Sequence, residues 1–211
     1  GPYGGSFGAT KGLYEEFGGE RVLDLPISEA GYVGSAVGAA ATGLRPVVEL
    51  QFCDWVTIAM DQICNQAANM RYMFGGLVKI PMVVRPPAGA YLQAAAQHSH
   101  SWESWFAFVP GLKVVFPSTP RDLKGLLKAS IRDNNPVLFF EHKKLYEERG
   151  EVPDDPDFLL PLGKADIKRE GRDITIVTYA YMVKFALKAA SILEKEGIDV
   201  EVVDLMTIKP M

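Results

Sequence analysis

The chain is 211 residues long, 48% of them are hydrophobic, and its formal net charge at pH 7 is −4. This content suffices for a sizeable buried core, while the acidic balance without a basic stripe argues against a nucleic-acid or anionic-membrane surface. No apolar run could span a bilayer, no signal peptide opens the chain, and two cysteines fit a reducing cytoplasm or organelle matrix.

Short β-branched runs alternate with helical patterns along the chain. The predicted strands are Arg21–Asp24, Pro46–Gln51, Pro81–Arg85, Leu112–Phe116, Pro136–Phe140, Asp173–Tyr179 and Asp199–Leu205. The predicted helices are Ala30–Thr42, Trp55–Phe74, Pro120–Arg132 and Val183–Glu196. Continuous apolar strands that alternate with helices are typical of a parallel sheet covered on both faces, so the predicted fold class is α/β.

A change in composition predicts a domain boundary. Residues 148–172 carry clustered charge and three prolines without a helical or strand period, and we interpret them as a linker. Residues 1–147 then form the first domain, and residues 173–211 begin a second α/β domain that is too short to close a core. Because the chain opens on Gly1 and stops at Met211 after a strand-like run, we expect a fragment of a longer protein.

The turns after the predicted strands are the places for a ligand site, because open parallel sheets bind ligands beyond the carboxyl ends of their strands. After the first predicted strand, Ser28 and Glu29 open a helix. Ser28 could be an N-cap with Glu29 complementing the helix dipole, or Glu29 could present a carboxylate to a ligand nitrogen. Spacing alone favours the capping interpretation.

The helix that follows carries Gly31, Gly34 and Gly38 among alanines. Glycine costs helix stability, so a run of glycines at three- and four-residue spacing needs a compensating reason. Such bare backbone permits close approach of another helix. The contact could lie within the domain or at a subunit interface, and we favour the interface slightly.

Histidines are the next candidates for chemistry. His98 and His100 would face one side of an extended segment, which is compatible with a metal site, and Glu103 or His142 would have to supply the third ligand. That spacing matches no strong zinc pattern. A loop histidine near a cleft is better interpreted as an acid/base or substrate-binding group, and a plain surface histidine is an equal alternative.

Other catalytic patterns are absent or weak. Cys53 directly follows a strand, as small buried cysteines do, and we reject it as a nucleophile. The sequence has no G-x-S-x-G elbow, no dinucleotide fingerprint and no P-loop, and it lacks a Gly-Asp-Gly segment that would hold a diphosphate through a metal.

Read as whole motifs, the sequence resembles the β subunits of the pyruvate, branched-chain 2-oxo acid and acetoin dehydrogenase first components (E1). The motifs occur in family order over essentially the entire chain. They include Gly5–Tyr14, Pro26–Glu29, Gly43–Val47, Met60–Ile63, Arg71–Met73, Ala96–Ser99, Pro110–Val115, Pro117–Pro120, Ala129–Pro136 and Glu141–Lys143.

The resemblance implies a transketolase-like fold, with a pyrimidine-binding domain followed by the start of a C-terminal domain. It implies an α2β2 heterotetramer with an α subunit and a second β subunit, acting with a lipoylated E2 core on a small 2-oxo acid, with no nucleic acid and no membrane. Thiamine diphosphate would lie at the subunit interface, and the α subunit would mainly hold its Mg2+. An acetoin-cleaving enzyme and a non-catalytic docking module of the same fold are the alternatives. A single-chain transketolase is disfavoured.

The resemblance also implies roles for individual residues. Glu29 matches a glutamate that hydrogen-bonds the cofactor's aminopyrimidine ring and relays protons. Trp55 matches an aromatic that packs on that ring, with Ile27 and Gln51 at neighbouring contact positions. His98 matches a histidine of substrate binding or acyl transfer. A loop that binds potassium in some members is matched by Ser130, Asp133 and Asn135.

Several residues depart from the family pattern. Leu25 stands where threonine is common, His100 where glutamine usually follows the His-Ser pair, and Tyr91 where a small residue is usual. In the second domain three more positions differ from the usual Gly, His and Arg, which puts partner or E2 contacts in doubt. These positions are Ala180, Lys184 and Met206.

Overall fold

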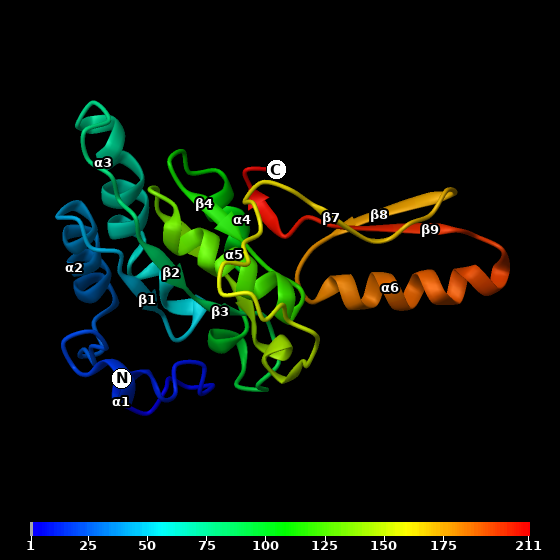
Figure 1. The fold of residues 1–211 in the computed structure, drawn as a ribbon, viewed down its shortest axis with the longest axis horizontal. Coiled ribbons are helices and arrows are strands. Elements are labelled where there is room, and N and C mark those ends of the chain that lie inside the picture. The colour runs from blue at the N-terminus through cyan, green and yellow to red at the C-terminus, as the bar shows by residue number, and fades with distance from the viewer. Residues whose placement is uncertain (1) are drawn as a thin grey trace.

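Most apolar runs of the chain form strands of a five-stranded sheet in a computed structural model that describes residues 2–211 (Figure 1). The strand order is β1-β2-β5-β4-β10, and a separate three-stranded sheet has the order β7-β9-β8. Strands of the larger sheet are β1 (Val47–Glu49), β2 (Val83–Arg85), β4 (Lys113–Val115), β5 (Val137–Phe139) and β10 (Thr207–Lys209), with a small pair β3 (Pro87–Ala88) and β6 (Glu141–His142) beyond it.

Helices cover both faces of the larger sheet, as the continuous apolar strands predict. The helices of this part of the chain are α1 (Leu13–Phe17), α2 (Glu29–Ala41), α3 (Ala68–Met73), α4 (Glu103–Ala107) and α5 (Pro120–Arg132), of which α1 has no buried residue. On one face Val84, Val114 and Leu138 pack with α2 and Phe106 of α4. On the other face the alternate strand residues pack with α5 and with Leu160 and Leu162 of the following segment. The predicted α/β class is therefore confirmed.

The pairs β1–β2, β2–β5 and β5–β4 are parallel, whereas β10 pairs with β4 in the antiparallel sense. The carboxyl ends of β1, β2 and β5 consequently lie side by side at one edge of the sheet. Helix α5 has the predicted bounds, because Pro120 can open a helix and the side chain of Thr119 accepts a hydrogen bond from the Asp122 N–H at 3.1 Å.

Two sequence predictions of secondary structure were wrong. Residues Arg21–Asp24 form no strand, and Leu23 is 62% exposed there, so the run lacks both a partner strand and a core to pack on. The predicted helix Trp55–Phe74 is divided into a 3₁₀ turn (Cys53–Thr57), a π-helical segment (Asp61–Ala67) and α3. Hydrophobic periodicity does not distinguish these helix types.

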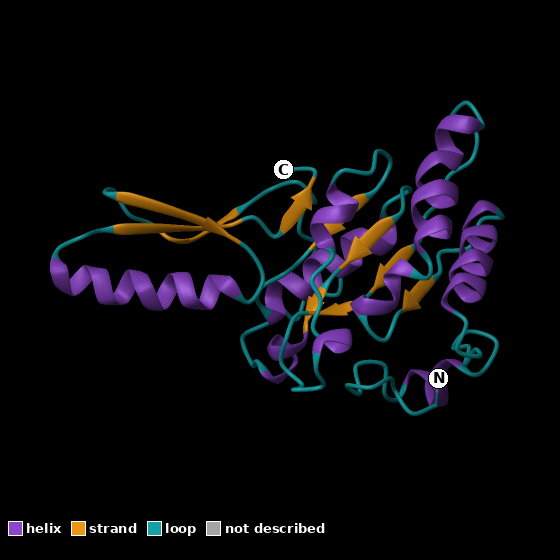
Figure 2. Ribbon diagram, turned by 180° about the vertical axis from the view of Figure 1, so that it is seen from behind, coloured by secondary structure: helices purple, strands orange, loops and turns teal. Residues whose placement is uncertain are grey.

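A second, smaller unit projects from the first (Figure 2). It contains β7 (Asp166–Arg169), β8 (Ile174–Thr178), β9 (Val200–Asp204) and α6 (Met182–Leu193), which covers one face of the three strands. Strand β7 lies inside the segment predicted to be a linker without secondary structure, so that interpretation was wrong for its last part. Only one of its four residues, Ile167, is apolar, and the strand forms by antiparallel pairing with β9.

Candidate active site

Three loops meet at the carboxyl edge of the larger sheet because β1, β2 and β5 are neighbours. The loop after β1 carries Gln51 and the 3₁₀ turn with Trp55. The loop after β2 and β3 runs through a second 3₁₀ turn (Ala96–His98), and the loop after β5 and β6 begins at Lys143. The larger sheet thus brings three of the predicted cofactor and substrate positions onto its carboxyl edge.

His98 lies among aromatic side chains in this arrangement. Its ring meets Trp55 edge-on at a centroid distance of 5.8 Å and Phe52 at 5.7 Å. The Nδ1 atom of His98 is buried and has no hydrogen-bond partner among residues 2–211. Buried polar atoms are nearly always paired with protein or ordered water, so this nitrogen is a candidate contact for a ligand.

Glu29 is the first residue of α2 and is half-buried. Ser28 occupies the N-cap position, but its side chain makes no capping hydrogen bond, so the expected cap is not formed. Burial raises the pKa of Tyr32, one turn further along, and the carboxylates of Glu29 and Glu49 raise it more. The negative charges of both carboxylates therefore disfavour ionisation of the Tyr32 phenol. Ile27, by contrast, is 94% exposed and touches little of the chain itself.

Gln51 is held on both sides by the chain. Its side-chain amide donates to Glu49 Oε1 at 2.7 Å, and its Oε1 accepts the Ser6 N–H at 3.1 Å. The amino-terminal segment also stacks Phe7 on Tyr146 with centroids 4.7 Å apart. Gln51 therefore forms a fixed wall of the site rather than a free amide.

A buried ion pair that the sequence did not predict lies behind Gln51. Arg85 at the end of β2 donates to both oxygens of Glu141, each at 2.8 Å, and the Tyr146 hydroxyl donates to the same carboxylate. Burial alone would lower the pKa of Arg85, but Glu141 raises it above its usual value. Burial and Glu141 likewise raise the pKa of Tyr146 and keep its hydroxyl protonated. The available sequence signal for this ion pair was Arg85 itself, a charged residue that directly follows two valines.

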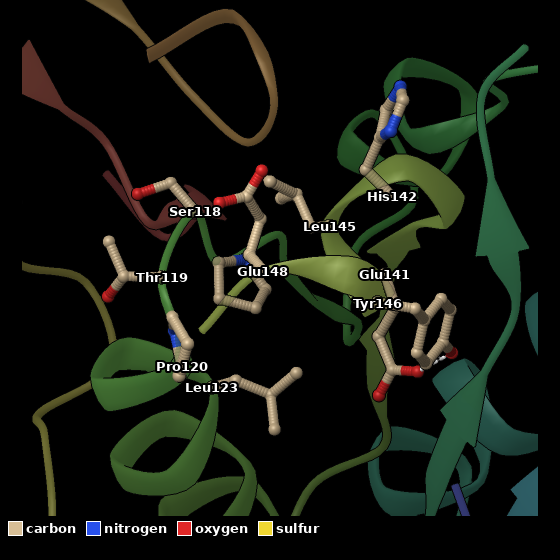
Figure 3. Close-up of a pocket in the computed structure, with 10 residues that line it drawn as sticks. Ser118, Thr119, Pro120, Leu123, Glu141, His142, Leu145, Tyr146 and Glu148 are labelled. Carbon is tan, nitrogen blue, oxygen red and sulfur yellow. Dashed lines mark hydrogen bonds between the residues drawn. The ribbon is translucent and has the colours of Figure 1, made fainter. Parts of the chain in front are cut away.

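A cavity of about 210 Å³ opens next to this ion pair (Figure 3). Ser118 and Thr119 from the loop after β4 line one side, and His142 and Tyr146 lie across from them. Glu29, Gln51, Trp55 and His98 do not line it. The cavity is therefore a separate feature from the predicted cofactor positions.

The histidines do not assemble into a metal site. Among residues 2–211 no group of three or more His, Cys, Asp and Glu side chains is placed to hold a metal ion. His100 pairs with Asp54 at 2.6 Å, while His142 stacks on Tyr181 and has a pKa lowered to about 4 by burial and by Lys143. Burial also raises the pKa of Cys53 to about 12, which agrees with rejecting it as a nucleophile.

The three residues predicted to hold potassium lie together, but their side chains are already engaged. Ser130 donates to the Leu126 carbonyl at 2.7 Å. Asp133 accepts from the backbone N–H and side chain of Asn135, each at 2.8 Å, and pairs with the ammonium of Lys113. Asn135 in turn accepts from an arginine, Arg71, at 2.9 Å. With these contacts made, the three side chains do not fit a potassium ligand set.

The five-stranded sheet has helices packed on both faces, and a smaller unit projects from it. This architecture defines a transketolase-like α/β protein. The solved structure described as "Split gene transketolase, inactive beta4 tetramer" superposes with a TM-score of 0.75 at 24% identity, covering 96% of this chain and 62% of that one. The chain belongs to the transketolase pyrimidine-binding domain family, which residues 3–149 match. Residues 163–211 match the transketolase C-terminal domain.

Curated relatives are considerably more similar in sequence. The acetoin:2,6-dichlorophenolindophenol oxidoreductase β subunit of Cupriavidus necator is 54% identical over 99% of this chain and 61% of its own length. The 2-oxoisovalerate dehydrogenase β subunit of Bacillus subtilis is also 54% identical, over 99% of this chain and 64% of its length. The pyruvate dehydrogenase E1 β subunit of Rhizobium meliloti is 52% identical, over 99% of this chain and 45% of its own length. The chain thus spans less than two thirds of these relatives.

Proposed function

We propose that this chain belongs to the β subunit of a thiamine-diphosphate-dependent 2-oxo acid dehydrogenase E1 component, of which it contains the pyrimidine-binding domain and the start of the C-terminal domain. The observation that carries the proposal is the edge-on contact of His98 with Trp55, with an unpartnered buried nitrogen, at the carboxyl edge of the sheet. Relatives at 52–54% identity carry the names of pyruvate, 2-oxoisovalerate and acetoin enzymes, so similarity alone does not choose the substrate. Oxidative decarboxylation of pyruvate or a branched-chain 2-oxo acid is the main proposal, and acetoin cleavage is the second.

The residues at the sheet edge fit an aminopyrimidine ring. Glu29 is half-buried, and its carboxylate accepts no side-chain hydrogen bond within residues 2–211, so it is free to hold a proton on a ring nitrogen. Trp55 is half-buried and supplies an aromatic face, and the exposed Ile27 supplies an apolar contact. When bound, thiamine diphosphate would supply the electron sink for decarboxylation.

Each side chain then has a distinct task. Glu29 would pass a proton to and from the pyrimidine nitrogen, and Trp55 would fix the plane of that ring. Gln51, tied to Glu49 and Ser6, would hold the wall beside it. His98 would bind the carboxylate or carbonyl of the substrate, or move a proton during acyl transfer to a lipoyl group, through the nitrogen that the chain leaves unpaired.

The partners follow from what these residues lack. No carboxylate cluster of residues 2–211 is placed to hold a divalent ion. An α subunit would accordingly supply the diphosphate and Mg2+ site, in an α2β2 heterotetramer that acts on a small 2-oxo acid with a lipoylated E2. No helix of residues 2–211 is long and apolar enough to cross a membrane. We propose a cytoplasmic or organelle-matrix location.

The test is a single-turnover assay with the full-length chain co-expressed with its α subunit. In the presence of thiamine diphosphate, CO2 release from pyruvate and 2-oxoisovalerate and acetaldehyde release from acetoin would be compared for the wild type and Glu29→Gln. We expect turnover of one substrate that collapses in Glu29→Gln, because the amide cannot relay the proton. A well-formed complex that turns over none of the three would instead favour the docking module.

A further inference from the structure

The backbone around His98 is held by one buried carboxylate. Asp54, in the 3₁₀ turn after β1, has a side chain that is only 3% exposed. Its Oδ1 accepts the backbone N–H of Ser99 and of His100, each at 3.1 Å, and lies 2.6 Å from His100 Nδ1. Three donors of the two residues that directly follow His98 therefore converge on one oxygen atom.

A buried lysine holds the same loop from the other side. The Nζ atom of Lys143 donates to the carbonyl of His98 at 2.7 Å and to that of Gly89 at 3.2 Å. It lies 3.9 Å from Asp54 Oδ2 and 4.7 Å above the ring of Phe52. Lys143 comes from the loop after β6 and Asp54 from the loop after β1, so the His98 loop is fastened to strands on both of its sides.

The loop also concentrates buried polar atoms without partners. Five such side-chain atoms occur in residues 2–211, and four belong to this region, namely Asp54 Oδ2, His98 Nδ1, Trp102 Nε1 and Glu103 Oε2. An unpaired buried polar group is costly, and native proteins pair such groups within the chain or with ordered water, so four of them in one region mark it as polar. A fold carries such a cost where polar groups are preorganised for a ligand or a reaction.

We propose that Asp54 is a positioning residue that, with Lys143, fixes the His98 ring against Trp55 in its reactive orientation. The inference rests on the proposed function of His98 and extends it to residues that do not themselves touch the substrate. The third donor to Asp54 comes from His100, the residue that replaces the usual glutamine of the family motif. In this chain Asp54 is therefore contacted by a histidine side chain at a position where the family usually has glutamine.

The experiment is a double-mutant cycle in the assembled α/β holoenzyme with thiamine diphosphate. Asp54→Asn, His98→Ala and the double variant would be compared in single-turnover decarboxylation and in acyl transfer to a lipoyl domain. We expect Asp54→Asn to lower the rate at least tenfold with His98 present, and less than twofold in the His98→Ala background. Asp157→Asn, at an 89% exposed carboxylate, is the control and should match the wild type.

Additive effects, or a wild-type rate in Asp54→Asn, would overturn the proposal. If Asp54→Asn does not assemble, His100→Ala replaces it in the cycle, since that side chain is 39% exposed and its removal leaves both backbone hydrogen bonds. About a threefold loss that vanishes without His98 is then expected, and no loss or an additive one would overturn the proposal. A wild type that turns over no substrate refutes the proposed function and this inference together, whereas an active wild type with additive variants refutes only the positioning role.

Discussion

Arg85 and Glu141, 56 residues apart in sequence, form a bidentate ion pair whose side chains are 9% and 3% exposed. The pair joins the carboxyl end of β2 to the segment after β5. Glu141 also accepts a hydrogen bond from the hydroxyl of Tyr146. It thereby fixes two of the three strand ends that carry the candidate active site. Charges so deeply buried are tolerated only because each one is compensated.

Removal of one partner should therefore be costly. We expect Arg85→Met to lower the free energy of unfolding by about 3 kcal/mol, because Glu141 is left as an uncompensated buried charge. The double variant Arg85→Met/Glu141→Leu should be more stable than either single variant. Urea unfolding of the three proteins measures this, and simple additivity of the two single losses would contradict the expectation.

His142 should make stability depend on pH. Burial, with help from Lys143, lowers its pKa to about 4 in the folded chain, compared with 6.5 for an unperturbed histidine. The unfolded chain then binds an extra proton between pH 6.5 and 4, so stability falls as the pH drops through that window and is unaffected above it. Because the ring is only partly buried, we expect a loss of about 1–2 kcal/mol.

The matched control for this effect is His142→Asn. An asparagine oxygen can still accept the backbone N–H of Lys144, which His142 Nδ1 accepts at 3.2 Å, but it does not titrate. Carboxylates titrate equally in both proteins, so the difference between their urea midpoints isolates His142. Parallel pH profiles from pH 7 to 4.5 would show that the ring is not held neutral.

Lys168 should connect the two units of the chain. Its Nζ lies 2.7 Å from Asp122 on α5 and 3.7 Å from Asp204 at the end of β9, and both aspartates are fully buried. Burial raises the pKa of Asp204, and removal of the ammonium would leave two buried carboxylates close together. We expect Lys168→Met to cost about 3 kcal/mol, and Lys168→Met/Asp204→Asn to recover part of it. Thermal unfolding would test this, and an unchanged midpoint would argue against the connection.

The sequence was sufficient for the α/β class because strands such as Val137–Phe139 are apolar on both faces and helices such as Pro120–Arg132 carry clear start signals. It was insufficient for Arg21–Asp24, where an apolar run found no partner, and for Asp166–Arg169, where a polar run found one. Strand formation depends on a neighbour far away in sequence, and local pattern does not identify that neighbour.

The same limit applies to the candidate site. Glu29 and His98 were predicted as site residues because they lie in motifs, whereas the buried contacts of Asp54, Arg85 and Lys143 were not predicted. A single charged residue in a sequence is normally exposed, and only its partners show that it is buried. For Asp54 those partners lie 45 and 46 residues further along the chain, so no local pattern could have indicated the pairing.

Helix α2 offers a test of the interface that its glycines suggested. A Cβ at Gly34 would lie 3.0 Å from the side chain of Gln62, so this glycine serves a contact within the domain. A Cβ at Gly38 would meet nothing within 4 Å, so nothing in residues 2–211 requires glycine there.

In the isolated chain we therefore expect Gly38→Ala to raise the free energy of unfolding by about 0.5–1 kcal/mol, and Gly34→Ala not to do so. If another subunit packs on this face, the same Gly38→Ala change must weaken assembly, which sedimentation of the β chain alone and with its α partner would detect. Stabilisation without any loss of assembly would place the interface elsewhere.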